Sequence, residues 1–164
     1  MIKEKSILIK KGLKIEIFSE NGILKRISIS RSLKKNGPIK EVREHKLLMR
    51  MVLKYLSKGK DEFLKVSLDL GGYTKKEQKV LKEMRKIPFG KTVSYKELAK
   101  MSGNVNSARF VGNVCKKNSF PLLIPCHRVI KNDGSLGGYT GGLNIKKELL
   151  KLETSYIAES KECI

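Results

Sequence analysis

The spacing of apolar residues changes once along the chain, and this change restricts the possible folds more than any other feature of the sequence. Between residues 14 and 29 apolar and polar side chains alternate, as is typical of a half-buried β-strand. Asn21-Gly22 interrupts the alternation and predicts a tight hairpin turn, because both residue types tolerate positive φ angles. From about residue 39 to residue 57 the apolar side chains recur at helical spacing instead. The predicted helical stripe comprises Val42, Leu47, Leu48, Met51, Val52 and Leu56.

The first part of the chain is therefore expected to form an antiparallel sheet with one helix. The apolar segment 63–70 is expected to add a further strand, and Gly71-Gly72 is expected to be a linker. We divide the chain accordingly into an N-terminal α/β structural domain, residues 1–72, and a C-terminal domain, residues 73–164, which the motifs below identify as the functional part.

The second part contains signals that open short helices. The segments 74–77 (TKKE) and 94–97 (SYKE) both match the capping box, in which a hydroxyl and a glutamate satisfy the first free N–H groups of a helix. The three predicted helices begin at the caps Thr74, Ser94 and Asn106 and run to about Lys86, Met101 and Lys117. The second and third helices, joined by a glycine-containing turn, are a helix-turn-helix candidate, although ordinary helical domains contain such pairs too.

The third of these helices has two different faces. Its packed side is expected to be formed by Ala108, Val111 and Cys115, flanked by Phe110 and Val114. The polar stripe, at i, i+3, i+4 and i+7, consists of Arg109, Gly112, Asn113 and Lys116. A glycine inside a helix costs about 1 kcal/mol relative to alanine. Gly112 therefore indicates a close approach, either of a DNA backbone or of another helix.

A formal net charge of +20 on 164 residues favours a polyanionic partner, and nucleic acid is the first candidate. The charge does not locate the binding surface, because residues 1–72 and residues 73–164 each carry 18 Lys or Arg and 8 Asp or Glu residues. The N-terminus lacks the apolar core of a signal peptide. The longest run without a charged residue is the twelve residues from Gly134 to Ile145, whereas a membrane span needs about 18 apolar residues. We therefore expect a soluble cytoplasmic protein.

The candidate reactive group is the cysteine of the hexamer IPCHRV, residues 124–129. The preceding segment, Pro121 to Pro125, is expected to be buried and extended, so that Cys126 and His127 point to opposite faces and need a turn or a bridging water to communicate. If they couple, the histidine can accept the thiol proton and yield the thiolate, which is the reactive form. The alternative is that Cys126 is a small buried core residue, the commoner role of a free cysteine.

The remaining cysteines and histidines do not suggest a metal site. Cys115, Cys126 and Cys163 form no CxxC pair, and the only histidines are His45 and His127. No familiar zinc-ligand spacing can be drawn from this set, so we expect reduced thiols and no metal.

Several segments of the second part together resemble the O6-alkylguanine-DNA alkyltransferases, or methylated-DNA–protein-cysteine methyltransferases. They occur in the order and spacing of that family over about 80 residues, whereas residues 1–72 resemble it only in the rough order of strands and helix. The matching segments are Val93 to Tyr95, Ala108-Arg109 with Val111-Gly112, Asn118, Pro125 to Val129, Gly138 to Leu143 and Lys146 to Glu153. The resemblance implies an α+β fold with a ribonuclease H-like N-terminal antiparallel sheet and helix. It also implies a mainly helical, winged-helix-like C-terminal domain that contains the helix-turn-helix.

The resemblance implies a monomeric DNA repair protein that binds double-stranded DNA in the minor groove through the helix-turn-helix. Such a protein flips O6-alkylguanine, and by extension O4-alkylthymine, into a pocket and transfers the alkyl group irreversibly to Cys126. Arg109 matches the residue that fills the gap left in the base stack, although alone it would be interpreted as a solvated helix charge. The implied DNA-binding residues are Ser94, Ala108, Arg109, Gly112, Asn113 and Lys116.

Within the pocket, the resemblance assigns to Cys126 the direct displacement at the alkyl carbon. Glu153 would orient His127, and His127 would draw the thiol proton through a water molecule. Asn118 matches the residue that holds the active-site turn, and Tyr95 matches the tyrosine whose hydroxyl serves N3 of the guanine. The implied substrate-binding residues are Pro121, Tyr139, Thr140 and Lys146, of which Tyr139 and Thr140 belong to a loop that covers the base. A thioether is a poor electrophile, so each molecule is expected to act once and to need no cofactor.

Each assignment also has a plainer alternative. Glu153 would be a surface residue at the edge of the stripe Ile145, Leu149 and Leu152, in a last helix capped by Asn144. Asn118 would be a helix C-cap, Tyr95 a half-buried aromatic, and the loop with Tyr139 and Thr140 a flexible connection. Lys146 would either assist that loop or contact phosphate. The alternative functions are a non-catalytic lesion-binding module on the same fold and a cysteine hydrolase that uses Cys126 and His127.

Overall fold

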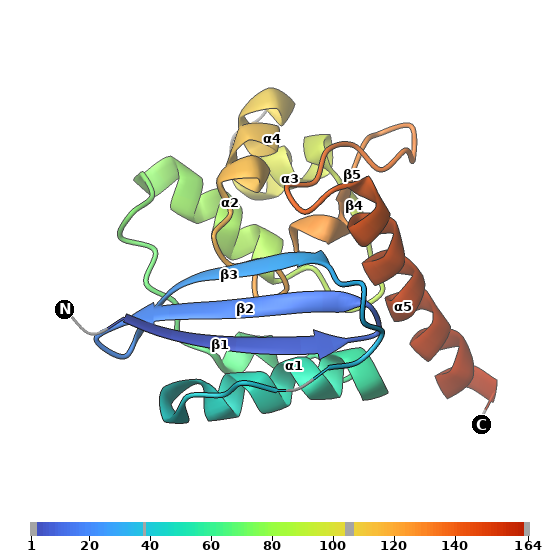
Figure 1. Cartoon of the computed structure of the whole chain (residues 1–164). Coiled ribbons are helices and arrows are strands. Elements are labelled where there is room, and N and C mark those ends of the chain that lie inside the picture. Colours follow the sequence, from blue (N-terminus) through green and yellow to red (C-terminus); the bar gives the residue numbers. More distant parts are fainter. Residues whose placement is uncertain (1–2, 38, 104–106, 163–164) are drawn as a thin grey trace.

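A computed structural model describes residues 3–37, 39–103 and 107–162 of the chain (Figure 1). Its first part is an antiparallel sheet in the order β1 (Lys3–Lys10), β2 (Leu13–Glu20) and β3 (Ile23–Arg31). Both connections are two-residue turns at Lys11-Gly12 and Asn21-Gly22, and all four residues have φ angles between 51° and 75°. The hairpin predicted at Asn21-Gly22 is thus confirmed, whereas β1 and its turn were not anticipated.

Helices surround this sheet. They are the α-helices α1 (Lys46–Lys58), α2 (Lys75–Arg85), α3 (Tyr95–Met101), α4 (Ala108–Lys117) and α5 (Leu143–Glu162), with the 3-10 helices η1 (Arg43–His45), η2 (Phe63–Lys65) and η3 (Cys126–Arg128). A second, parallel pair joins β4 (Val93–Ser94) to β5 (Val129–Ile130). Figure 1 shows α1 along the sheet, α2 to α4 on the other side of it, and α5 beside one end of the strands. The chain is thus a mixed α/β protein.

The two predicted capping boxes are confirmed. The Thr74 hydroxyl accepts the Glu77 N–H at 3.3 Å, and the Glu77 carboxylate accepts the Thr74 N–H at 2.9 Å. The Ser94 hydroxyl and Glu97 make the same reciprocal pair at the start of α3. The predicted cap of the next helix, Asn106, lies outside the described residues.

Two details of the first part differ from expectation. The segment 63–70 begins with the 3-10 turn η2 and forms no strand, because the Arg85 guanidinium, rather than a neighbouring strand, binds its carbonyl groups. Leu47 is 66% exposed because α1 begins only at Lys46 and turns this side chain to solvent. The buried face of α1 consists of Leu48, Met49, Met51, Val52, Tyr55 and Leu56.

The sheet is joined directly to the segment that precedes the IPCHRV hexamer. The Ile27 N–H of β3 donates to the Ser119 carbonyl at 2.8 Å, so the edge strand fixes the chain just after α4. The Tyr73 hydroxyl accepts the Ser119 N–H at 2.9 Å and donates to the Lys117 carbonyl at 3.1 Å. In the described part of the chain, no helix combines the length and the apolar composition needed to cross a membrane.

Candidate active site

The chain turns sharply just before Cys126, and the extended segment predicted for Pro121 to Pro125 is wrong. Leu122 has a φ angle of +72°, and the Ile124 N–H donates to the Phe120 carbonyl at 2.8 Å. The apolar side chains of the segment can be buried in a turn because its backbone polar groups bond one another and Asn118. The turn leads into η3, which supplies the change of direction that Cys126 and His127 require.

Asn118 holds this turn from its position at the end of α4. Its side-chain Nδ2 donates to the Ile124 carbonyl at 2.8 Å, and its Oδ1 accepts the Phe120 N–H at 3.0 Å. The Asn118 side chain also lowers the pKa of Cys126, against the larger effect of burial. Asn118 is therefore both a C-cap and the organiser of the turn, so its two interpretations are compatible.

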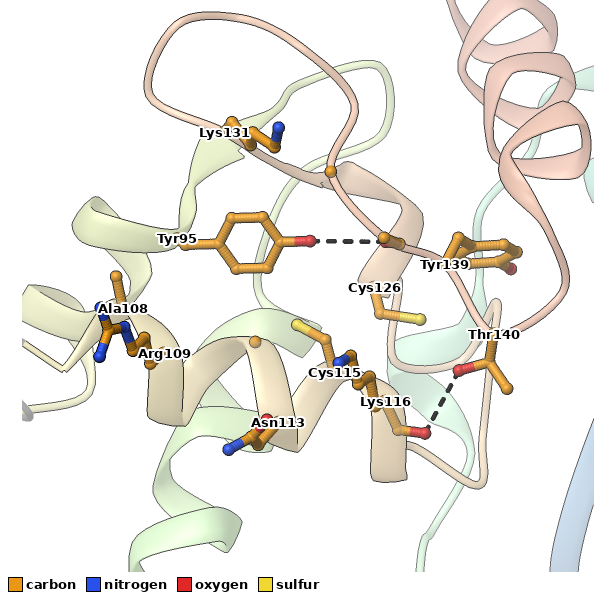
Figure 2. Close-up of a pocket in the computed structure, with 13 residues that line it drawn as sticks. Tyr95, Ala108, Arg109, Asn113, Cys115, Lys116, Cys126, Lys131, Tyr139 and Thr140 are labelled. Atoms are coloured by element: carbon orange, nitrogen blue, oxygen red, sulfur yellow. Dashed lines mark hydrogen bonds between the residues drawn. The ribbon is translucent and has the colours of Figure 1, made fainter.

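Cys126 lies in the wall of a pocket of about 490 Å³ between α4 and the loop that precedes α5 (Figure 2). The residue is 5% exposed, and the pocket gives access to its side chain. The lining residues are Tyr95, Ala108, Arg109, Gly112, Asn113, Cys115, Lys116, Cys126, Lys131, Gly137, Gly138, Tyr139 and Thr140. The polar stripe of α4, the Cys126 thiol and the glycine-rich loop thus line the same pocket.

The loop is held to the two helices that face it. The Thr140 hydroxyl donates to the Lys116 carbonyl at 3.2 Å, and the Tyr95 hydroxyl donates to the Gly138 carbonyl at 3.4 Å (Figure 2). Gly137 has a φ angle of +66°, and a Cβ there would lie 2.8 Å from the Tyr95 ring and hydroxyl. Only glycine fits this close approach, so the loop is a shaped wall of the pocket rather than a loose connection.

The thiol and the imidazole are both neutral at rest. Burial raises the pKa of Cys126, and the Asn118 hydrogen bond and the Lys146 charge only partly oppose this effect. Burial likewise lowers the pKa of His127, in spite of the opposing hydrogen bond and charge of Glu153. A free thiolate is therefore scarce, and a proton must leave the sulfur when it reacts.

Glu153 stands behind the histidine as a fully buried carboxylate with several donors. Its Oε1 accepts the His127 Nε2–H at 2.8 Å and Arg128 Nη2 at 2.9 Å, and its Oε2 accepts the Gly90 N–H at 2.8 Å. Burial alone would raise the pKa of Glu153, but the hydrogen bonds and charges of His127 and Arg128 outweigh it and lower that pKa to about 2. Among the described residues, the buried Nδ1 of His127 has no hydrogen-bond partner.

Some predicted site residues do not face the pocket. The Ser94 side chain is only 6% exposed and its hydroxyl caps α3, and its contact with DNA stays a prediction. Pro121 lies in the turn before Cys126 and is not among the residues that line the pocket, and its contact with substrate stays a prediction. Glu153, with no exposed area, is buried and not at the edge of a stripe.

Lys146 is buried and hydrogen-bonds the loop, as one of its two interpretations expects, and its contact with substrate stays a prediction. It has no exposed surface, and its ammonium donates to the carbonyls of Val129 at 2.6 Å, Gly138 at 3.3 Å and Leu136. Asn144 does not cap α5, since the Ile145 and Lys146 N–H groups both donate to the carbonyl of Gly142.

Three residues of the site were not assigned a role from the sequence. Arg128 is buried, binds Glu153 through Nε and Nη2, and donates to the Ile87 carbonyl at 2.7 Å. Its Nη2 also contacts Asp61 Oδ2 at 2.6 Å. The Tyr55 hydroxyl donates to Glu153 Oε1 at 2.6 Å. A tyrosine on the apolar stripe of a helix needs a polar partner when it is buried, and this was the available signal.

No group of three His, Cys, Asp or Glu side chains is placed to hold a metal ion within residues 3–37, 39–103 and 107–162.

Comparison with known proteins points to one family. The family model described as 6-O-methylguanine DNA methyltransferase, DNA binding domain, matches residues 75–155. The methylated-DNA–protein-cysteine methyltransferase of Methanothermobacter thermautotrophicus is 46% identical over 86 residues, which are 52% of this chain and 48% of that protein. The human protein of the same name is 43% identical over 76 residues, which are 46% of this chain and 37% of that protein. The chain thus spans about half or less of the length of these curated relatives.

The structural match covers more of the chain than the sequence matches to these relatives do. The crystal structure of Mycobacterium tuberculosis OGT in complex with DNA matches with a TM-score of 0.75 and 31% identity, and the match covers 92% of each chain. Because the match covers 92% of this chain, it extends into residues 1–72 as well as over the segment 75–155. From the pocket, the matched domain and this shared fold, we conclude that the chain belongs to the 6-O-methylguanine DNA methyltransferase family.

Proposed function

We propose that this protein is a single-turnover DNA repair protein that transfers the alkyl group of O6-alkylguanine, and of O4-alkylthymine, from duplex DNA to its own Cys126. The observation that carries the proposal is the position of Cys126 in the wall of a pocket that opens beside the polar stripe of α4. His127 follows Cys126 in η3 and is hydrogen-bonded to Glu153 at 2.8 Å.

The transfer is a direct displacement. The sulfur attacks the alkyl carbon, an S–C bond forms, and the C–O6 bond breaks with its electron pair remaining on the guanine. The thiol proton passes through a water molecule to Nδ1 of His127, the ring nitrogen that has no partner among the described residues. Burial raises the pKa of the thiol, so this proton must leave as the sulfur attacks. Glu153 keeps the other ring nitrogen protonated and stabilises the imidazolium that forms.

The leaving guanine needs a donor, and Tyr95 is suited to supply it. Its hydroxyl lines the pocket, and its weak bond to the Gly138 carbonyl, at 3.4 Å, is easily exchanged for a bond to N3 of the base. Burial raises the pKa of Tyr95 to about 12, so the hydroxyl keeps its proton at neutral pH. Tyr139 closes the pocket from the loop, and its buried hydroxyl has no partner among the described residues.

The DNA surface is α4, the second helix of the helix-turn-helix pair α3 and α4. Arg109, Asn113 and Lys116 are exposed on this helix, and Arg109 stands at the pocket, where it can fill the place of the flipped base. Among the described residues, a Cβ at Gly112 would contact only the Tyr95 ring, at 4.0 Å. Internal packing does not require glycine there, which favours close approach of a minor-groove backbone over packing of another helix.

The finer features of the fold and its setting belong to the same proposal. We assign residues 1–72 to a ribonuclease H-like structural domain and residues 73–164 to a winged-helix-like domain that carries the DNA-binding and acceptor groups. We further propose that the protein acts as a monomer on the minor groove, in the cytoplasm, without a cofactor. The formal charge of +20 supports the phosphate contacts that such binding requires.

The decisive experiment mixes the protein with duplex DNA containing one O6-methylguanine and records the intact mass and a peptide map. We expect one added methylene on the Cys126 peptide, no further transfer after one equivalent, and no transfer to Cys126→Ser, which still binds the duplex with near wild-type affinity. An unchanged mass with retained lesion binding would mean a non-catalytic module. Repeated release of product from an ester or peptide would mean a cysteine hydrolase.

A further inference from the structure

A tyrosine of the N-terminal part enters the hydrogen-bond network behind the acceptor cysteine. Tyr55 lies on α1, has no exposed surface, and donates its hydroxyl proton to Glu153 Oε1 at 2.6 Å. The same hydroxyl oxygen is 3.3 Å from Nε2 of His127. Tyr55 therefore touches both partners of the histidine–carboxylate pair without touching the pocket.

The direction of these hydrogen bonds follows from the acidities. Burial and the neighbouring Glu153 raise the pKa of Tyr55 well above 10, so its hydroxyl remains a donor and the carboxylate is its acceptor. Nε2 of His127 then faces two oxygen atoms, the carboxylate Oε1 at 2.8 Å and the phenol oxygen at 3.3 Å. Only an N–H fits between two oxygens, so the neutral imidazole carries its proton on Nε2 and its lone pair on Nδ1.

We propose that Tyr55 is a positioning residue for the transfer reaction, which holds the Nε2–H tautomer of His127 and limits how strongly Glu153 draws that proton. The inference rests on the proposed function, in which the Nδ1 lone pair receives the thiol proton. The Tyr55 hydroxyl donates a hydrogen bond to Oε1 and so partly offsets its negative charge. A carboxylate that already accepts this hydrogen bond stabilises the imidazolium of His127 less. Tyr55 thereby lowers the pKa of His127, so that the imidazole stays neutral and can act as a base at a lower pH.

The other charged groups around the imidazole stay in place when the hydroxyl is removed. The charges of Glu153 and Lys146, both on α5, and of Arg128 in η3 act on His127, and the neutral thiol of Cys126 adjoins it in the chain. Asp61 acts one step further away, through Arg128. All of these groups are common to the wild type and to a Tyr55→Phe variant, so a difference in titration reports the phenol alone.

Phenylalanine is expected to occupy the same place. The Tyr55 ring packs against the rings of Phe63 and Phe89, with centroids 5.4 Å and 5.8 Å away. These contacts involve the ring and not the hydroxyl. Glu153 also keeps its hydrogen bonds from His127, Arg128 and Gly90, so it is not left without donors.

Tyr156→Phe is the matched control. Tyr156 lies on α5 and donates its hydroxyl to the Leu56 carbonyl of α1 at 3.0 Å, one residue beyond Tyr55. The control removes one tyrosine hydroxyl from the contact between the same two helices without touching the network. A general loosening of this contact would therefore affect both variants alike.

The test is an NMR titration of the ring nitrogens of ¹⁵N-labelled full-length protein. The chain has only two histidines, so His45 is an internal reference. We expect the neutral wild-type His127 to carry its proton on Nε2, and we expect Tyr55→Phe to raise its pKa by about half a unit to one unit. Tyr156→Phe should leave it unchanged. A wild-type His127 protonated on Nδ1, an unchanged pKa in Tyr55→Phe, or an equal shift in both variants would overturn the inference.

Transfer rates link this result to the reaction. Below the pKa of His127 the base is lost, so the acid limb of the rate profile should move to higher pH in Tyr55→Phe and lower the rate on that limb about three- to tenfold. The rate on the alkaline plateau should change little. If the wild type transfers no alkyl group while the titration behaves as expected, the proposed function fails and the network inference stands. If the wild type transfers the alkyl group but the titration does not behave as expected, only the role of Tyr55 is rejected.

Discussion

The charge of Glu153 should make the protein unfold in acid, and the size of the effect follows from its surroundings. Its pKa is lowered from an ordinary 4.5 to about 2 in the folded protein. A group with a lowered folded pKa contributes stability above its unfolded pKa and loses it as the pH falls through the folded one. The difference of roughly two and a half units corresponds to about 3 kcal/mol at pH 7, of which about 2 kcal/mol is gone at pH 3.

The lowered pKa of His127 acts in the same direction. A buried neutral imidazole binds protons less readily than the unfolded chain does, so its contribution to stability is lost as the pH falls below its ordinary value of 6.5. A whole domain is stable by only about 5–15 kcal/mol. His127 and Glu153 together thus account for a substantial share of the stability that is lost in acid.

Urea unfolding followed by circular dichroism at pH 7, pH 5 and pH 3 measures this effect. The decrease in unfolding free energy between pH 7 and pH 3 should be smaller by about 2 kcal/mol in Glu153→Gln than in the wild type. Glu148→Gln, a change on the same helix at a partly exposed residue paired with Arg31, should keep the full drop. If Glu153→Gln does not fold, a ¹³C titration of the wild-type carboxyl replaces it. A carboxyl that titrates near 4.5, or an unchanged drop in Glu153→Gln, would refute the reasoning.

Two further predictions concern the pocket and its DNA face. Arg109→Ala should slow transfer from duplex DNA about tenfold or more, because flipping a base costs a few kcal/mol, and should leave the reaction with free O6-benzylguanine unchanged; equal slowing of both would exclude a role in flipping. Gly137→Ala should cost about 1–3 kcal/mol of unfolding free energy and slow transfer, because its φ angle is +66° and its Cβ would meet the Tyr95 ring at 2.8 Å. Gly138→Ala is the control, because a Cβ there would meet no described residue within 4 Å, and equal effects would contradict this account of the loop.

Local signals were predicted well because their causes are local. The caps at Thr74 and Ser94 are bonds between residues three apart, and the turn at Asn21-Gly22 depends on two φ angles. The strand β1 was missed because its inward face begins with Ser6, a polar residue that breaks the alternation. Ser6 is buried because it hydrogen-bonds His45 at 2.9 Å, a partner 39 positions away that no local pattern reveals.

The site shows the same division. Cys126, Arg109 and the loop glycines were found through the resemblance, and the structure brings them to one pocket. The burial of Glu153 and its contact with Tyr55 could not be predicted, because the two residues are 98 positions apart and meet only when α1 and α5 pack together. The strand predicted at 63–70 failed for a related reason, since a distant guanidinium took the carbonyl groups that a strand would have paired.

The hydrogen bond between β3 and the chain after α4 links the sheet to the position of Cys126. Because Ile27 binds the Ser119 carbonyl, the alignment of β3 on β2 also sets where the segment leading to Cys126 begins. A shift of one residue in a strand turns every side chain to the opposite face. An insertion in the short hairpin at Asn21-Gly22 would therefore be transmitted to the thiol, although it lies more than a hundred positions earlier in the chain. The alignment and length of the strands therefore help to set the position of the Cys126 sulfur, although the sheet lies far from Cys126 in the sequence.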